Sequence, residues 1–526
     1  MSLPKQQAAL DISYTDDERV VRAAATEDYS THVVPHSWRS GRWSLASARW
    51  ALFSAMFWLY VAVASADAVG TPNTLIGMAL TVVTYGAVNS VLSRYAARTG
   101  LTVALLSRRL FGLLGSALAP LIFAATAVYY AVFEGSVIAV AFQKYFGGEL
   151  KLWYLAVVIY ALPLVIGGVR IWLDRLNGVL LPFYVAGLIA AVVATTVRQG
   201  YPENWLSSAA SSSALPGWLT AYLIYMGVWI MMMFTFDYAR FGKVEDQRFH
   251  STVTFGWVFY VFTFAVNGLI GIYLLRAWDI SGSETGVIDA FINALGFVGV
   301  LVIFVSQTRI NTANYYLASS NLEAFGSRVL RLHPPRVVWV GVAGVIAYLL
   351  MLTDVLSYLL VALAWQGVFI TAWVAIAMTH IFLHRSDAEI PEFRPGRLPA
   401  LTAGALAWIV ASGIGIALTV QTASAVAAEL APVITVVLAV AGYALAERYG
   451  ASTLQARGND PRDEVDDAWE ARIRCHVCDL SYVAIEMDRD PSAGGAAICS
   501  ACAENSSEML RAVEVETTVA ADRAPG

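Results

Sequence analysis

Long apolar stretches alternate with short polar segments between residues 46 and 446. A helix needs about 20 mainly apolar residues to cross the hydrocarbon core of a bilayer. By this measure the sequence predicts twelve membrane-spanning helices, with approximate bounds 46–68, 74–96, 114–142, 152–170, 176–198, 216–237, 252–276, 290–325, 337–353, 355–383, 399–420 and 425–446. The predicted fold class is therefore an all-α integral membrane domain.

The loops between these spans differ in their basic residues. If both termini are cytoplasmic, every inner loop carries two or more arginines or lysines, such as Arg108 and Arg109, whereas the outer loops hold little more than Lys144 and Lys151. Cytoplasmic loops of membrane proteins are enriched in these residues. The pattern predicts a multi-pass protein of the plasma (inner) membrane with both termini in the cytoplasm.

The composition agrees with this prediction and divides the chain. Of the 526 residues, 58% are hydrophobic and 14% are charged, whereas soluble domains carry about 25% charged residues. Both ends are polar, and the N-terminal end has no apolar core of a signal peptide. The predicted parts are a cytosolic segment 1–45, the twelve-span domain 46–446, a linker 447–470, a metal-binding module 471–510 and a disordered tail 511–526.

A carboxylate interrupts the third predicted span. Glu134 lies near its middle, one helical turn after Tyr130, so the two side chains share a helix face. Ionisable residues inside a membrane are costly and usually functional. Glu134 is expected to accept hydrogen bonds from a ligand or to bind the proton that drives transport. The alternative is that it pairs with a buried arginine and only fixes helix packing.

The sixth predicted span combines a possible break with a tryptophan. Gly227 permits local unwinding at mid-span, and Trp229 beside it could stack on a flat ligand. The alternative is a tryptophan packed in the core, away from the interface where tryptophans gather. Asp237 and Arg240 close this span, and they either end the helix or form a gating salt bridge.

The eighth predicted span contains the polar sequence SQTRINTANYYLASSN, residues 306–321. On a helix, the residues Asn311, Asn314, Ala318 and Asn321 share one face because each is three or four positions from the next. Carboxamides donate and accept, so two of them can read a ligand edge that bears C=O beside N–H. The alternative is that they hydrogen-bond to neighbouring helices.

Several segments together resemble the purine–cytosine permease branch of the nucleobase–cation symporter-1 family. They are EDYSTHVVPHSWR before the first span, TGLTVALLSRRLFGLLGSAL before the third, FDYARF closing the sixth and NTANYYLASSNL in the eighth. The resemblance covers about residues 27–446. It implies a LeuT-like fold of two inverted five-helix repeats plus two extra helices, with substrate bound at the midplane beside broken helices one and six.

The resemblance also implies roles for single residues. Tyr130 and Glu134 would contact the base from the third helix, Trp229 beside Gly227 would stack on its ring, and Asn311 and Asn314 would bind its edge. Where Glu134 stands, the family usually has glutamine or asparagine, so the preferred base is expected to differ or the carboxylate to respond to protons.

The coupling ion is predicted from Arg309. Arg309 and Ile310 stand where sodium-coupled members of the family have small or hydroxyl residues. A guanidinium is a permanent cation and could replace Na⁺ electrostatically. Coupling to H⁺, or uniport, is therefore favoured over Na⁺. The first candidates for a carboxylate partner of Arg309 are Glu134 and Asp67.

All four cysteines lie near the C-terminal end, as the pairs Cys475–Cys478 and Cys499–Cys502. Two CxxC pairs at this spacing are typical of a zinc site, and four thiolates leave no open coordination position. The sequence thus predicts a structural zinc ion, with iron or a redox pair as alternatives. Such a module is expected to dock on a cytosolic protein or to regulate the membrane domain.

The leading hypothesis is a secondary active transporter that imports a nucleobase of the cytosine or purine type, or a related planar heterocycle. Alternatives within transport are allantoin, hydantoin or a pyridine vitamin as substrate. A different class is a receptor derived from a transporter, which signals through the zinc module. The spans show no nucleophile–base pair or metal triad, so no enzyme is predicted, and no nucleic acid partner is expected.

Overall fold

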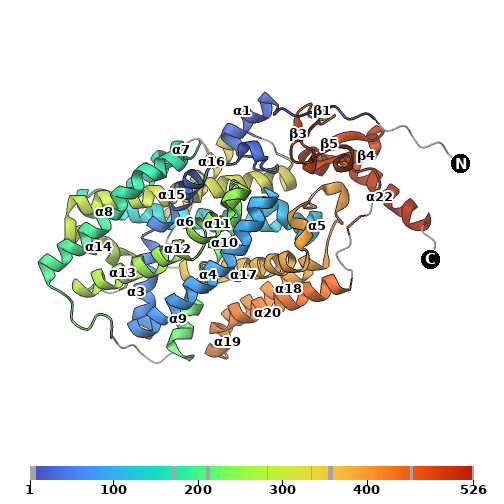
Figure 1. The fold of residues 1–526 in the computed structure, drawn as a ribbon. Coiled ribbons are helices and arrows are strands. Elements are labelled where there is room, and N and C mark those ends of the chain that lie inside the picture. Colours follow the sequence, from blue (N-terminus) through green and yellow to red (C-terminus); the bar gives the residue numbers. More distant parts are fainter. Residues whose placement is uncertain are drawn as a thin grey trace.

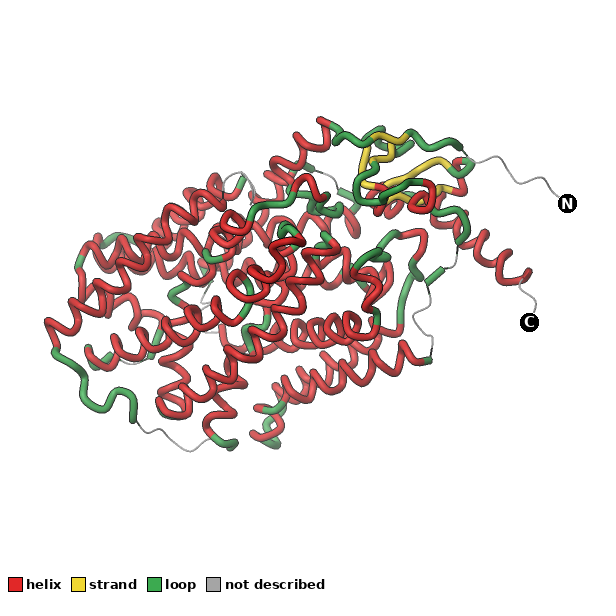
Figure 2. The backbone as a smooth tube through the Cα atoms, viewed as in Figure 1, coloured by secondary structure: helices red, strands yellow, loops and turns green. Residues whose placement is uncertain are grey.

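The structure is a computed structural model, which describes residues 8–166, 173–208, 214–280, 282–332, 334–353, 359–449, 454–455 and 457–523. The described chain is mainly helical, and its few strands lie near the two termini (Figure 1, Figure 2). The predicted spans 152–170 and 355–383 and the predicted parts 1–45, 447–470 and 511–526 extend in places beyond these residues.

The helices of the first half run from residue 42 to residue 199. They are α2 (Arg42–Arg49), α3 (Phe57–Val69), α4 (Thr71–Thr99), α5 (Val103–Gly115), α6 (Leu118–Phe146), α7 (Leu150–Val165) and α8 (Asp174–Gln199). Apolar side chains on every face allow most of them to lie in lipid or in the protein core. The shorter α5 is kinked at Gly112, whose φ of 76° suits glycine.

The second half repeats this arrangement. Its helices are α9 (Gly217–Met226), α10 (Ile230–Ala239), α12 (Trp257–Tyr260), α13 (Asn267–Ala277), α14 (Glu284–Leu295), α15 (Phe297–Phe325), α16 (Arg336–Met351) and α17 (Leu359–Leu383). Three further helices follow, namely α18 (Ala403–Val420), α19 (Ala425–Glu429) and α20 (Ala431–Arg448). In Figure 1, α18 and α20 lie side by side along one flank of the bundle.

Each predicted span coincides with a helix or a helix pair in the described part of the chain. Among the described residues, seven helices are long and apolar enough to cross a membrane, and the number is nine if each of two bent pairs is one span. The other three predicted spans are α7 and α16, with 16 residues each, and α15, with 29 residues. α15 is long enough to cross a membrane, but its polar second half keeps it out of the apolar set. The protein is a multi-pass membrane protein.

Two of the spans are broken and run in opposite directions. Residues 42–54 and α3 are bent by 42°, and α9 and α10 by 45°. The start of α2 lies beside the end of α10, where Ser40 N donates to Phe241 O over 2.8 Å. At the other end of the bundle, Ala68 of α3 and Thr220 of α9 line the same cavity. Each broken helix is thus the first helix of one of two repeats, and the two repeats are inverted relative to each other.

Segments from both ends of the chain form a small unit, here called the terminal module (residues 8–40 and 457–523). Its elements are β1 (Ile12–Ser13), α1 (Glu18–Glu27), β2 (Arg472–Arg474), β3 (Ser481–Val483), β4 (Met487–Asp490), β5 (Ala496–Cys499), α21 (Ser500–Asn505) and α22 (Ser507–Arg523). The antiparallel order β1-β2-β3 joins the two termini in one sheet, and β4 pairs with β5.

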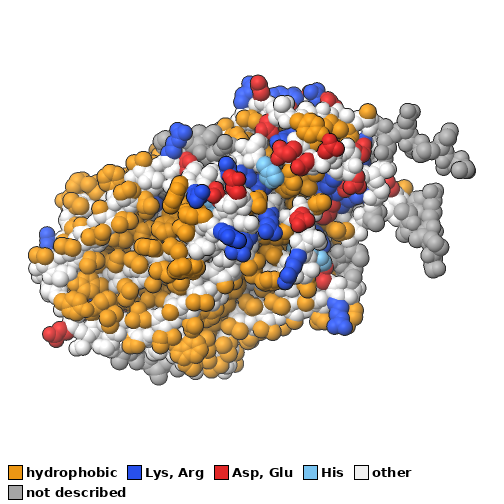
Figure 3. All heavy atoms as spheres, in the orientation of Figure 1, with side chains coloured by type: hydrophobic (Ala, Val, Ile, Leu, Met, Phe, Trp, Pro, Cys, Tyr) orange, Lys and Arg blue, Asp and Glu red, His pale blue; other side chains and the backbone are white. Residues whose placement is uncertain are grey.

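The terminal module covers one end of the helix bundle, which we call the module end (Figure 1). On the face shown in Figure 3, hydrophobic side chains cover the helices, whereas charged side chains gather around the module and the nearest helix ends. This distribution is what a membrane domain with one large polar cap requires, since charged side chains avoid the hydrocarbon core.

Candidate functional site

The break in the first span is held by two side chains of α15. Ser306 Oγ donates to Ser54 O over 2.5 Å, and Ser54 Oγ donates back to Ser306 O over 3.2 Å. Gln307 Oε1 accepts from the backbone N–H of Met56, 3.2 Å away. A broken helix leaves backbone groups without helical partners, and in a membrane these need partners from the protein. Here α15 supplies them.

Gln307 also reaches the predicted carboxylate. Its Nε2 donates to Glu134 Oε2, while Glu134 is 1% exposed in the middle of α6. A single amide thus connects the carboxylate on α6 to the break in the first span. No ion pair to Glu134 is found among the described residues, so the alternative of a buried arginine partner finds no support.

The second break lies at the predicted Gly-x-Trp. Residues 227–229 separate α9 from α10, and Trp229 is 5% exposed. The indole packs edge-on against Tyr85 of α4, with ring centroids 6.4 Å apart. A Cβ on Gly367 of α17 would lie 3.1 Å from Gly227 O, so α17 approaches this break closely.

A cavity of about 450 Å³ lies between the two broken helices, away from the module end. Its lining is mainly apolar and includes Phe57 and Tyr60 of α3, Gly227 and the carboxylate of Glu429. The Phe57 ring also packs edge-on against Tyr130, with centroids 5.6 Å apart. Of the six predicted substrate-binding residues, Gly227 lines this cavity, and Tyr130 lies behind the Phe57 ring.

Three of the predicted binding residues carry buried polar atoms without a partner in the described protein. They are the hydroxyl of Tyr130, the indole Nε1 of Trp229 and the amide Nδ2 of Asn311. Buried polar groups are nearly always hydrogen-bonded, and each exception calls for an explanation, such as water or a ligand. All three atoms can donate, and they come from α6, the second break and α15.

The asparagines of α15 share a face as expected. Asn314 Nδ2 lies 3.4 Å from Asn311 Oδ1, and both residues are 1% exposed. A Cβ on Gly135 would lie 3.4 Å from Asn311 Nδ2, which places this amide against α6 beside Glu134. Further along α15, Asn321 Nδ2 donates to Asp237 Oδ2 over 3.3 Å.

Arg309 is fully buried on another face of α15. Its NH2 donates to Trp50 O over 3.0 Å, and its Nε and NH1 have no partner in the described protein. Trp50 is the C-terminal cap of α2, so its carbonyl lies at the negative end of a half-helix. The structure shows no carboxylate within ion-pair distance of Arg309 in the described ranges, neither Glu134 nor Asp67.

Asp67 lies elsewhere, at the end of the bundle away from the module. Its Oδ1 accepts from Arg276 over 2.7 Å and its Oδ2 from the backbone N–H of Gly282 over 3.0 Å. Side chains of both members of the pair are about one-third exposed. Asp67 therefore fixes the loop after α13 rather than neutralising Arg309.

Asp237 and Arg240 lie at the module end, as their place at the end of the sixth span predicts. Asp237 Oδ1 accepts from Val103 N over 2.7 Å at the start of α5. Arg240 donates to the backbone oxygens of Asp237 and Tyr29, over 3.0 and 2.9 Å. The two side chains thus use separate partners and together connect α10 to α5 and to the N-terminal segment.

Sequence reasoning did not single out two buried residues of this region. Gln307 lies four residues before Asn311, so helical spacing from the asparagines could have identified it. Arg49, which is fully buried, donates to Thr235 Oγ1 over 3.1 Å, and its guanidinium lies 4.8 Å from the ring centre of Phe259. The composition of the first span gave no signal for Arg49 beyond its charge.

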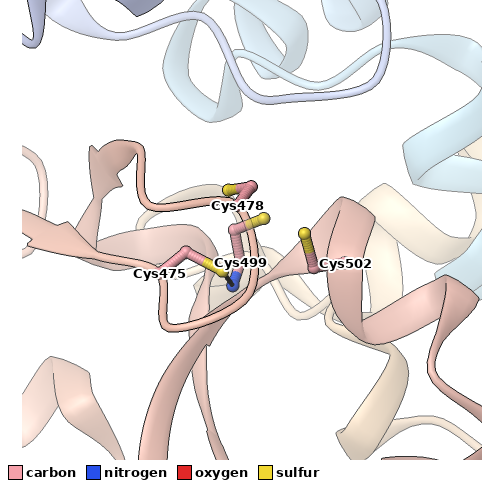
Figure 4. Close-up of side chains that lie close together, drawn as sticks. All are labelled: Cys475, Cys478, Cys499 and Cys502. Carbon is pink, nitrogen blue, oxygen red and sulfur yellow. Dashed lines mark hydrogen bonds between the residues drawn. The ribbon is translucent and has the colours of Figure 1, made fainter.

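The four cysteines of the terminal module come together as predicted. Their Sγ atoms lie within 4.8 Å of one another, all four are free thiols, and Cys499 N donates to Cys475 Sγ over 3.4 Å (Figure 4). Sulfurs around a tetrahedral Zn²⁺ at about 2.3 Å from the metal lie about 3.8 Å apart. The cluster therefore fits a metal ion held by four thiolates, which would be structural.

No protein-family model and no curated protein matches the chain by sequence. Solved structures match by fold. Mhp1, a nucleobase-cation-symport-1 family transporter in a closed conformation with bromovinylhydantoin bound, aligns with a TM-score of 0.64 at 16% identity over 80% of this chain and 95% of Mhp1. A Na⁺-coupled sialic acid symporter in a substrate-bound outward-open state aligns with a TM-score of 0.58 at 13% identity, over 82% and 97%.

A third match is MhsT in complex with L-phenylalanine, with a TM-score of 0.51 at 13% identity over 77% of this chain and 99% of MhsT. These likenesses, together with the two oppositely directed broken helices, confirm the predicted LeuT-like fold of inverted five-helix repeats. The small cysteine-containing unit at the C-terminal end is added to that fold.

Proposed function

We propose that the protein is a secondary active transporter that imports a nucleobase of the cytosine or purine type, or a related planar heterocycle, by alternating access. The observation that supports this best is the pair of buried donors on Tyr130 and Asn311, which have no partner in the described protein. Donors without protein partners suit a ligand that carries several carbonyl oxygens or ring nitrogens.

In this proposal each residue has a role that its chemistry allows. The Trp229 ring stacks on the heterocycle, and Asn311 and Asn314 bind the edge of the ring. Glu134 accepts a ring N–H when it exchanges its bond with Gln307 for one with substrate. The ligand named for Mhp1, bromovinylhydantoin, contains a flat ring with alternating carbonyl and N–H groups. Hydantoins and allantoin are therefore alternatives to a nucleobase.

The same proposal includes coupling to H⁺ instead of Na⁺. Half-helix C-terminal ends and unwound carbonyls bind the coupling cation in transporters with broken helices. In this chain the Arg309 guanidinium, a permanent cation, donates to such a carbonyl, Trp50 O. Glu134, buried between α6 and α15, is the proposed proton carrier. The sialic acid symporter is Na⁺-coupled, so this chain would differ from it.

A thermal-shift screen of the purified protein against nucleobases, hydantoins and allantoin tests the substrate class. Specific ligands raise the melting temperature by mass action. Stacking on an aromatic ring contributes about 1–3 kcal/mol per base, so Trp229→Ala should lose most of the shift, as should Asn311→Ala. Trp218→Ala, in α9 and 39% exposed, is the matched control and should keep it. Equal shifts in all variants would place the substrate elsewhere.

Uptake into proteoliposomes tests the coupling. A proton gradient should drive uptake of the ligand that the screen identifies, without Na⁺ on either side. Glu134→Gln should abolish the dependence on the proton gradient while counterflow exchange continues. Strict dependence on Na⁺ would contradict the proposed role of Arg309.

A receptor is the second candidate, and the terminal module is the observation that favours it. The module is attached to the membrane domain through the buried ion pairs of Glu504 with Arg108 and Arg328. A movement of the helices on ligand binding would therefore move the module as well. We place the module end in the cytoplasm, where zinc is the proposed metal. Ligand binding without any uptake or counterflow would favour a receptor over a transporter.

A further inference from the structure

The cysteine cluster and the module end of the membrane domain meet at one short helix. α21 begins directly after Cys499 and contains Ser500, Cys502 and Glu504. Two metal-ligand candidates thus stand within two residues of the side chains that contact the membrane domain. No predicted function of the membrane domain accounts for this arrangement.

Glu504 forms a buried ion triad with two arginines of the membrane domain. Its carboxylate pairs with Arg108 of α5 and with Arg328, which lies in the π-helical turn at the end of α15. Ser500 Oγ accepts from Arg108 NH1 over 2.8 Å. The side chains of the triad are between 7% and 13% exposed. Removing one member of a buried ion group is strongly destabilising, because the other charges remain buried without a partner.

The two arginines belong to elements that continue into helices of the candidate site. Arg328 ends the helix that carries Gln307, Asn311 and Asn314, and Arg108 lies in the helix that leads into α6. A bond from one side chain to both arginines fixes α5 relative to the end of α15. The module is thus attached to α5 and to the end of α15 by the same carboxylate.

A second contact, within the terminal module, joins its N-terminal segment (residues 8–40) to its C-terminal part over the same end. Glu486, fully buried in the module, accepts from Val33 N over 3.1 Å and pairs with His32 Nδ1 at 2.8 Å. This segment continues to Tyr29, whose carbonyl accepts from Arg240 of α10 over 2.9 Å. The module therefore binds α5, α15 and, through the N-terminal segment, α10.

A metal ion held by the four cysteines would stabilise the module. Apart from its contacts with the membrane domain, its own hydrophobic cluster is small and centres on the buried cysteines, with Ile473, Met487 and Ile498 around them. Small domains of this kind are usually unfolded without their metal, because binding free energy is their folding free energy. Loss of the metal would thus remove Ser500 and Glu504 from Arg108 and Arg328.

We propose that the metal-bound cysteine cluster holds the module end closed through Glu504, so that loss of the metal allows this end to open. Four converging thiolates suit Zn²⁺, which is the ion of this proposal. The protein would then permit or restrict passage according to the zinc supply on the module side. This inference does not depend on which substrate the membrane domain carries.

The test measures opening directly. Ser320 of α15, 9% exposed, lines a small cavity at the module end together with Asp237 and Arg240. The thiol introduced by Ser320→Cys is labelled with a membrane-impermeant maleimide in the full-length protein, and labelling at this position is quantified by peptide mass spectrometry. Metal content is measured on the same samples.

With zinc bound, Glu504→Gln should raise the labelling rate at this position by about tenfold or more, a size expected when a closed state becomes partly open. Glu508→Gln, which makes the same change of charge on an exposed position of α22, should leave the rate unchanged. Zinc removal by a chelator should reproduce the rise, and added Zn²⁺ should reverse it.

The controls keep the result interpretable. Glu504→Gln must retain the zinc content of the parent protein, because the proposal places its effect after metal binding. If labelling stays slow in zinc-free protein and in Glu504→Gln, the module does not close this end and the proposal is wrong. If labelling is fast in the zinc-bound parent protein, the module end is already open and the proposal is equally wrong.

Discussion

A buried arginine without a carboxylate partner is unusual in a membrane domain, since a charge at this depth costs at least about 2.5–3.5 kcal/mol. Arg309 offsets part of this cost by donating a hydrogen bond to one carbonyl, Trp50 O, which lies at the negative end of a half-helix. Arg309 stands where sodium-coupled members of the family that the sequence resembles have small or hydroxyl residues, and it provides a permanent positive charge there. Removing Arg309 should therefore change how ligand binding depends on Na⁺.

We expect Arg309→Ala to weaken ligand binding about tenfold, equivalent to about 1.4 kcal/mol, because the half-helix end loses its cation. Na⁺ should partly restore binding in this variant and should have no effect on the parent protein. Titration calorimetry in sodium and in choline buffer measures both. Arg198→Ala, whose guanidinium donates to Asn293 O on the surface, serves as control. An Arg309→Ala protein that binds normally in choline would refute the assignment.

At the scale of elements, the main feature is that side chains of α15 hydrogen-bond to the backbone at the break in the first span. Ser306 and Gln307 supply the hydrogen bonds that the break in the first span lacks, and Gln307 extends the connection to Glu134 on α6. The break, α15 and α6 are thus joined by one amide. If Glu134 changes its hydrogen bond with Gln307, the bond between Gln307 and Met56 N is expected to change as well.

Replacing this amide should destabilise the protein as a whole. Gln307→Leu leaves Met56 N and Glu134 buried without their partner, and each unsatisfied buried group costs about 1–3 kcal/mol. The melting temperature in detergent should fall clearly. Gln143→Leu, whose amide donates to Gly148 O on the exposed end of α6, should leave it nearly unchanged. Equal melting temperatures for the two variants would show that the break needs no support from α15.

The sequence predicts the elements better than their partners. Apolar length identifies nearly every span because lipid imposes it on any helix that crosses a bilayer. The Gly-x-Trp at 227–229 correctly indicates a break, whereas the break at Ala55 and Met56 has no glycine or proline to signal it. The carboxylates proposed for Arg309 were not found near it, because helical phase says which way a side chain points but not which helix it meets.

At the scale of the whole molecule, charged networks attach the terminal module to the loop between α17 and α18. Arg394 donates to Glu392 and to Asp460, with N···O distances of 2.6 Å for both ion pairs. Burial alone would raise the pKa of Glu392, but Arg394 and Arg462 outweigh it and lower the pKa to about 2. The same arginine holds the pKa of Asp460 below its usual value against the effect of burial.

These shifts predict an acid-sensitive attachment. A carboxyl group whose pKa is lower in the folded protein than its ordinary value of 4.5 stabilises the fold above that pH, and this stability is lost as the pH falls towards 2. The melting temperature should therefore fall between about pH 5 and pH 3, and less steeply in Glu392→Gln. Glu389→Gln, at an exposed position of the same loop, should follow the parent protein. Parallel curves for all three would contradict this.

The cysteine spacing predicted a metal-binding module, but not where it lies. Its contacts join residues that are hundreds of positions apart, such as Arg108 with Glu504 and His32 with Glu486. Nothing in the spacing or charge of either segment marks these pairs, because every one of them becomes close only after the membrane domain has folded.

The sheet order β1-β2-β3 also sets a sequence of events during synthesis. Ile12 pairs with Ile473, so β1 has no partner in this sheet until β2 has left the ribosome. All membrane helices are made before that moment. A chain that stops before residue 472 contains all the membrane helices but leaves Arg108 and Arg328 without Glu504 as their partner.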